Sequence, residues 1–162
     1  AGPCAEAMER AYDEASVAPS SVHYVETHGS GVPEEDRAEA EALVRVFSRG
    51  GARALPAALG GVKPAIGRAG AAAGLASLVK AALALYQQIL PPMDLETPRA
   101  ELSGREDLFH VPHRPQYWLR NRADGPRRAG ASRRGRPRAP RAQGRRRRGT
   151  RAGRAPSASR GH

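Results

Sequence analysis

Three polar side chains stand in glycine-rich stretches of this sequence that are otherwise small and apolar. His28 begins the loop "HGSG", and Lys63 and Arg68 lie in "VKPAIGRAG", residues 62–70. A histidine between a strand and a Gly-x-Gly loop is held by rigid backbone, and we expect it to face a cleft. Arginine stays protonated and carries several hydrogen-bond donors, so Arg68 could stabilise an oxyanion or bind a carboxylate.

The first loop is preceded by a predicted strand and followed by a predicted helix. Residues 22–27, "VHYVET", alternate and contain β-branched and aromatic side chains, which is typical of a buried strand. Asp36 is a suitable N-cap for a helix over 37–48, whose Leu43, Val46 and Phe47 form one apolar face. His28 is therefore expected at a strand end.

The second loop has the same setting. Residues 58–64 read as a short strand that ends at Pro64, because proline disfavours continuation of regular structure before it. Residues 65–70 are expected to form a loop. A helix over 71–88 follows, and because it is apolar nearly all round we expect it to be buried.

The remaining patterns complete an α/β class. Residues 5–17 have apolar side chains at helical spacing, and "QYWL", residues 116–119, is the best later strand candidate. The order helix, strand, helix, strand, helix favours a layered α/β architecture. Histidines 23, 110 and 113 are expected to be structural or in loops, and they provide too few ligands for a metal site.

Length and composition indicate one domain followed by a different segment. The chain has 162 residues and 40% hydrophobic content. Its single cysteine, Cys4, excludes an intrachain disulfide. We expect a cytoplasmic protein, because no signal segment or membrane-length apolar run stands out in these residues.

The basic character of the chain belongs to its last residues. All 16 acidic residues precede Gly125, whereas 14 of the 27 basic residues follow it. Because residues from Gly125 onward contain no aromatic side chain and no aliphatic one larger than alanine, we expect them to be disordered. A charge of this density would bind polyanions, so a basic nucleic-acid-binding protein is the alternative function.

Two ordered motifs resemble one known family. They are "VETHGSGVPEEDRAEAEAL", residues 25–43, and "GGVKPAIGRAGAAAGLASLVKAALALYQQILPP", residues 60–92. Together they resemble the C-terminal half of a β-ketoacyl synthase domain of polyketide or polyunsaturated fatty acid synthases. The resemblance covers roughly residues 5–132. It implies an incomplete thiolase-like α/β fold, with a domain at 1–132 and an arginine-rich tail at 133–162.

The resemblance implies an acyltransferase that condenses acyl and malonyl-type thioesters. In that family two histidine N–H donors stabilise the oxyanion. His28 would be the first donor, the alternative being a solvated loop histidine. Ser30 and Val32 would stand where two hydroxyl side chains hold the phosphopantetheine arm. Only Ser30 keeps a hydroxyl there.

The second motif departs from the family at two positions. Lys63 would be the active-site lysine, but its usual glutamate partner is replaced by Gly70. Arg68 occupies the position of the second histidine. A permanent cation there would favour a bound carboxylate before it leaves, which does not accelerate the reaction. Arg68 is alternatively a mark of a non-condensing or altered copy.

The family also implies what this chain would need. Its nucleophilic cysteine belongs to the N-terminal half, and Cys4, on a predicted helix, is expected to be inert. The isolated chain is therefore expected to be inactive. No tightly bound cofactor is expected, and the implied partners are an acyl carrier protein, the N-terminal half and a second copy of the domain.

The resemblance ends abruptly at Ser132. The residues that follow are arginine, glycine, alanine and proline, which have GC-rich codons. A shift of reading frame would explain both the sudden end of the resemblance and this composition. On that interpretation the tail at 133–162 is out of frame, and nucleic-acid binding is not its role.

Overall fold

The computed structural model describes residues 2–51, 53, 55–93, 99–119 and 125–132. Its elements, in chain order, are α1 (Gly2–Glu14), η1 (Pro19–Ser21), β1 (Tyr24–Glu26), α2 (Pro33–Ser48), β2 (Ala57–Gly60), α3 (Lys63–Ile66), α4 (Ala72–Gln87), β3 (Ile89–Leu90), η2 (Ala100–Leu102), β4 (Phe109–His110), β5 (Gln116–Tyr117) and β6 (Ala129–Ala131). The predicted tail at 133–162, with its proposed shift of frame, lies outside the described residues.

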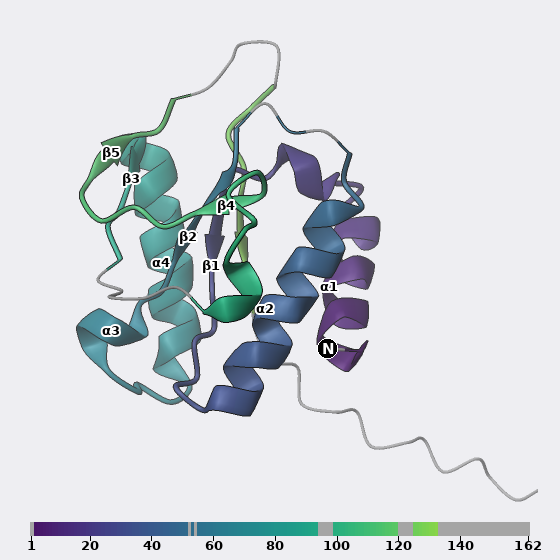
Figure 1. Ribbon diagram of the computed structural model, residues 1–162. Helices are drawn as coiled ribbons and strands as arrows, with labels where there is room; N and C mark the ends of the chain where they lie inside the picture. The colour runs from purple at the N-terminus through teal and green to yellow at the C-terminus, as the bar shows by residue number, and fades with distance from the viewer. Residues whose placement is uncertain (1, 52, 54, 94–98, 120–124, 133–162) are drawn as a thin grey trace, which may run out of the picture.

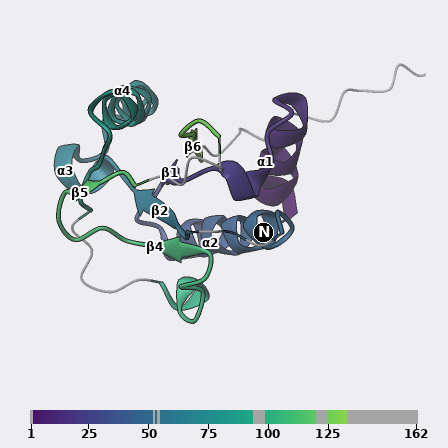
Figure 2. The same cartoon turned by 90° about the horizontal axis from the view of Figure 1, so that it is seen from above.

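A parallel sheet forms the centre of the described structure. Its strand order is β4-β2-β1-β6, and each neighbouring pair is parallel. Helices α1 and α2 lie on one face of this sheet and α4 lies on the other (Figures 1 and 2). A separate antiparallel pair joins β3 to β5. The α/β class expected from the sequence is confirmed.

The two central strands, β1 and β2, are buried on both faces because each supplies side chains to two cores. Val25 and Leu59 pack with the helices α1 and α2, in the cluster that contains Leu43 and Phe47. Tyr24 and its neighbours face α4, in a second cluster of buried side chains: Ala58, Ala81, Ala84, Leu90 and Trp118. Successive side chains of β1 alternate between two covered faces, which explains why this strand is apolar or aromatic at most positions.

A buried ion pair connects the sheet to α4. Glu26 at the end of β1 is fully buried, and its carboxylate lies 2.7 Å from Lys80 Nζ. The Tyr24 hydroxyl also donates to Glu26, and Lys80 donates to the Gly61 carbonyl at 3.1 Å. Burial and this hydrogen bond raise the pKa of Tyr24 above its usual range. Gly60 faces this group, and a Cβ there would overlap the Tyr24 ring at 2.8 Å from Cζ.

Two boundaries near the site differ from the sequence prediction. Strand β2 ends at Gly60, and Pro64 lies in the first turn of the short helix α3 instead of ending a strand. Proline is accepted there because the first helical N–H groups have no partner inside the helix. Helix α2 begins at Pro33, so Asp36 lies inside its first turn and is not its N-cap.

Two larger expectations are also wrong. Helix α4 is not buried all round, because only Ala73, Ala81 and Ala84 are buried among its residues. Order does not end at Gly125, because β6 pairs with β1 in parallel register. Small side chains permit this pairing, and a Cβ on Gly130 would lie 3.0 Å from the Tyr12 hydroxyl. Composition alone does not show backbone pairing of this kind.

Every helix within the described ranges is too short or too polar to span a lipid bilayer.

Candidate functional site

A cleft of about 450 Å³ lies beyond the carboxyl ends of β1 and β2. Its lining includes His28, Lys63 and Arg68, the three side chains that the sequence singles out. His28 follows β1 by two residues, and Lys63 begins α3 just after β2. Because neighbouring parallel strands end at the same edge of a sheet, both loops converge there. The predicted convergence of His28 and Lys63 is confirmed.

Two carboxylates of α2 hold the N–H groups of the His28 loop. Glu39 accepts hydrogen bonds from the backbone of His28 at 2.7 Å and of Gly29 at 2.9 Å. Asp36 accepts from the backbone of Ser30 at 2.6 Å and of Gly31 at 3.0 Å. Gly29 and Gly31 have φ values of 49° and 76°, where glycine is favoured. The loop therefore turns its N–H groups toward the start of α2.

Two cations hold the carbonyl groups of the same loop. Lys63 Nζ donates to the His28 carbonyl and lies 3.2 Å from His28 Nδ1. The Arg68 guanidinium donates to the Ser30 carbonyl. The Gly31 position is close to this contact, since a Cβ there would lie 3.4 Å from Arg68 Nη2. Lys63 and Arg68 thus connect the second loop to the first.

The environment of Lys63 is less polar than water. Burial lowers its pKa below the usual lysine range, while the carboxylates of Glu39 and Asp36 act in the opposite direction. The positive charge of Arg68 adds to the lowering. Glu39 and Asp36 act on Lys63 only through their charge, because both carboxylates accept N–H groups of the His28 loop. The active-site role expected for Lys63 stays a prediction.

Ser30 and Val32 have different positions in this loop. Ser30 is buried, and its hydroxyl donates to Asp36 at 2.9 Å and accepts from the Val32 N–H at 3.0 Å. Val32 immediately precedes α2 and is not among the residues that line the cleft. The substrate-binding role expected for these two residues stays a prediction.

Cys4 lies on α1 and not in a strand-to-helix turn. It lines a smaller cavity of about 140 Å³ that also borders His28, Glu39 and Ser132. The expectation that Cys4 is inert stays a prediction.

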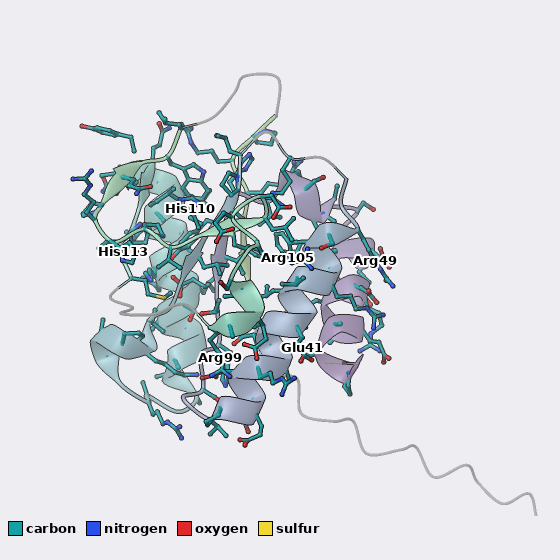
Figure 3. The ribbon with its side chains drawn as sticks, in the orientation of Figure 1. Glu41, Arg49, Arg99, Arg105, His110 and His113 are labelled. Atoms are coloured by element: carbon teal, nitrogen blue, oxygen red, sulfur yellow. The ribbon has the colours of Figure 1, made fainter. Side chains whose placement is uncertain are left out.

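The other histidines that the structure describes, His23, His110 and His113, do not line the cleft. His110 is on β4, not in the loop expected from its neighbouring proline, and His113 is exposed nearby. Figure 3 shows both above Arg99 in that view, and Arg99 lies near the start of α2, where it donates to the Pro33 carbonyl. Within the described parts of the chain, no group of three or more His, Cys, Asp or Glu side chains is placed to hold a metal ion.

Sequence reasoning missed several residues of this site. Glu39 lies nearly two turns into α2, which begins at Pro33, and in the sequence it looks like an ordinary surface acid of an amphipathic helix. Its only signal is the run of acids after the glycine loop. Arg99 and Met93 also line the cleft, but they come from a proline-rich stretch without a recognisable pattern. Thr27 donates to the Gly60 carbonyl at 2.9 Å. It was not singled out from the sequence, because it is the last residue of the predicted strand.

Comparison with known proteins identifies the family. The model of the β-ketoacyl synthase C-terminal domain matches residues 2–94. Polyketide synthase ThaG of Burkholderia thailandensis is 45% identical over 91 residues, which are 55% of this chain and 2% of that protein. Hybrid PKS-NRPS synthetase pytA of Aspergillus terreus is 36% identical over 126 residues, 77% of this chain and 19% of that protein.

Solved structures agree with this result. The ketosynthase from module 6 of the bacillaene synthase of Bacillus subtilis 168 superposes with a TM-score of 0.65 and 35% identity, covering 73% of this chain and 21% of that one. Ketosynthase twelve of the bacillaene polyketide synthase of Bacillus amyloliquefaciens superposes with a TM-score of 0.67 and 28% identity, covering 73% of this chain and 21% of that one. The chain thus spans about a fifth or less of each of these relatives. Because the family model matches more than half of its residues, the chain belongs to the β-ketoacyl synthases and carries their C-terminal domain.

Proposed function

We propose that this chain supplies the C-terminal half of a condensing domain of a polyketide synthase. In this role His28 donates a hydrogen bond to the thioester oxygen of a malonyl-type substrate. The observation that carries the proposal is the 3.2 Å contact between Lys63 Nζ and His28 Nδ1 inside the cleft. It supports Nε2 as the ring nitrogen that acts on a substrate.

The contact supports one tautomer of His28. An ammonium group has three donors and no acceptor, so with a protonated Lys63 the ring accepts at Nδ1 and carries its proton on Nε2. Lys63 also donates to the His28 carbonyl, which holds the ammonium on the Nδ1 side of the ring. A neutral imidazole with its N–H on Nε2 is a suitable oxyanion donor.

The reaction needs such a donor at one defined atom. When the malonyl-type thioester loses CO₂, the electron pair of the broken C–C bond moves onto the thioester oxygen and forms an enolate. The enolate carbon then attacks an acyl group held as a thioester on a cysteine of the other half of the domain, and the thiolate leaves. A preorganised donor at the developing oxyanion contributes about 3–4 kcal/mol in comparable sites.

The same loop is proposed to border the phosphopantetheine arm of a carrier-bound substrate. Ser30 Oγ already donates to Asp36 and accepts from Val32, so one lone pair of the hydroxyl is left for the arm. Val32 would offer only an apolar contact. We therefore expect the arm to be held mainly by other groups, and no tightly bound cofactor is needed.

The implied partners are an acyl carrier protein, the N-terminal half of the domain and a second copy of the complete domain. An uncovered apolar face on α4 supports the second of these. Exposed side chains on that helix include Leu75, Leu78, Val79, Leu83 and Tyr86. A contiguous apolar face of this kind is typical of a protein contact. The location of the assembled enzyme is proposed to be cytoplasmic.

The test is complementation. The chain is co-expressed with the N-terminal half of the ketosynthase from module 6 of the bacillaene synthase, and β-ketoacyl product is measured from acyl and malonyl thioesters. His28→Ala should lower the rate at least about a hundredfold, because it removes the oxyanion donor. His113→Ala is the matched control and should not change the rate. Equal rates for the two variants would contradict the role of His28.

Nucleic-acid binding is not favoured. The arginine-rich segment on which that alternative depends lies outside the described residues. The family match and the relatives above point to acyl condensation instead.

A further inference from the structure

Lys63 and Arg68 bring two positive charges into the cleft without a carboxylate partner of their own. In the described parts of the chain, no ion pair within 4.0 Å involves either residue. The third cation at the cleft, Arg99, differs because it lies 3.4 Å from Glu101 and donates to the Pro33 carbonyl. Lys63 and Arg68 are thus the cations of the cleft that are available to an anion.

The acids that line the cleft are already occupied. Each carboxylate oxygen of Glu39 accepts a backbone N–H, from His28 and Gly29. Both oxygens of Asp36 accept from the loop as well. These carboxylates hold backbone and do not form ion pairs with Lys63 or Arg68. The cations therefore keep donors for a ligand, although the acids reduce the net positive potential.

Arg68 is fixed in a way that suits carboxylate recognition. One Nη atom donates to the Ser30 carbonyl, which anchors the end of the side chain at the cleft. A guanidinium has five N–H donors in a planar fork, so most remain for a second partner. An anchored fork loses less freedom on binding than an unrestrained lysine would.

We propose that Arg68 and Lys63 form a carboxylate-binding site in this cleft, for a small dicarboxylate or an acyl thioester that carries a free carboxylate. Binding of a carboxylated acyl thioester rests on the proposed function. Binding of a small dicarboxylate does not depend on it. Arg68 would select carboxylated over uncarboxylated substrates, a role that a neutral imidazole at the same position would not have.

The same site would retain the carboxylate. In decarboxylation the negative charge leaves the carboxylate and moves onto the thioester oxygen, and the carboxyl group departs as neutral CO₂. A permanent cation at the carboxylate stabilises the reactant more than the transition state. Arg68 would therefore strengthen binding and slow the loss of CO₂, whereas His28 would act only on the oxygen that gains charge.

Binding of malonate to the full chain tests the site directly. Calorimetric titrations compare malonate with acetate, for the unaltered chain and for Arg68→Gln. We expect malonate to bind more tightly than acetate, and Arg68→Gln to weaken malonate binding by roughly tenfold or more, since a charge-assisted bond is lost. Arg105→Gln, on an exposed arginine outside the cleft, is the matched control and should bind malonate like the unaltered chain.

Further measurements separate loss of the carboxylate site from loss of folding, and the guanidinium fork from its charge. Circular dichroism checks that Arg68→Gln is folded, and Arg68→Lys keeps the charge without the fork and should bind with intermediate affinity. Malonyl and acetyl thioesters of N-acetylcysteamine show whether the site also accepts the thioester, with the malonyl form preferred. Equal affinities for malonate and acetate, or unchanged malonate binding in Arg68→Gln, would overturn the proposal. Either result stands independently of the condensation assay, which tests His28.

Discussion

At the scale of single residues, charge holds the backbone of the His28 loop from two sides. Glu39 and Asp36 accept its N–H groups, while Lys63 and Arg68 donate to its carbonyls. Backbone groups with special φ values need such partners, because the loop cannot satisfy them through a helix or sheet ladder. The direction of the His28 ring therefore depends on residues that come from α2 and from the segment after β2.

The strongest single support is expected from Glu39. Glu39→Ala removes an acceptor shared by the part-buried hydrogen bonds from the His28 and Gly29 N–H groups, and we expect the free energy of unfolding to fall by about 1.5–3 kcal/mol. Glu41→Ala on the same helix is the matched control. It breaks an exposed ion pair with Arg37 and should cost about 0–1 kcal/mol. Urea unfolding followed by the fluorescence of buried Trp118 measures both, and similar losses would contradict the loop-holding role.

The residues of the site were partly accessible to prediction. His28, Lys63 and Arg68 could be identified because their glycine-rich settings and their order resemble a known family. Glu39 could not be identified, because its role as an acceptor for the loop depends on which face of α2 turns toward the loop. Arg99 could not be identified either, because it comes from a proline-rich stretch that has no recognisable pattern.

At the scale of elements, alternation and helical spacing predicted the order and type of α1, β1, α2, β2 and α4. The ends were less accessible. Pro64 is compatible both with the end of a strand and with the first turn of a helix, and only the turn after β2 decides between them. Strand β6 consists of alanine and glycine, so nothing in its side chains predicts a strand. Its pairing with β1 is a property of the assembled sheet.

Strand β4 carries a histidine whose ionisation should be visible in stability. Burial lowers the pKa of His110 below 6.5, and hydrogen bonds with Gln116 and the Pro56 backbone oppose this effect only in part. As the pH falls through 6.5, the unfolded chain takes up a proton that the folded chain does not. The free energy of unfolding should therefore fall with decreasing pH, until the folded pKa is reached and the loss stops.

Replacement of this histidine provides the check. Urea unfolding between pH 7.5 and pH 5 should show a weaker decrease for His110→Asn than for the unaltered chain. His113→Asn, on a neighbouring exposed histidine, is the control and should keep the original slope. If His110→Asn had the same pH dependence as the unaltered chain, another group would be responsible.

At the scale of the whole molecule, α4 has a covered side and an uncovered one. Ala73, Ala81 and Ala84 are buried, and the last two lie in the core beside Tyr24 and Trp118. Tyr86 is 81% exposed and Leu75 is 67% exposed. The sequence predicted burial all round because it records the apolar content of the helix and not the number of surfaces that meet it. The apolar content of α4 also predicts that this helix leaves an apolar patch when the C-terminal half is isolated. The exposed apolar side chains of α4 are consistent with such a patch.

This uncovered face should govern how the chain behaves when it is expressed alone. We expect it to self-associate, and amide hydrogens of α4 in the monomer to exchange faster than those of α2, which packs against α1 and has Leu43, Val46 and Phe47 buried in the core. The double variant Leu78→Gln and Leu83→Gln should reduce self-association in sedimentation experiments. Ile66→Gln, on an exposed apolar residue of α3, should have little effect. Strong protection throughout α4 in a monomer would show instead that the half-domain is stable without cover, and that the N-terminal half is needed for chemistry and not for folding.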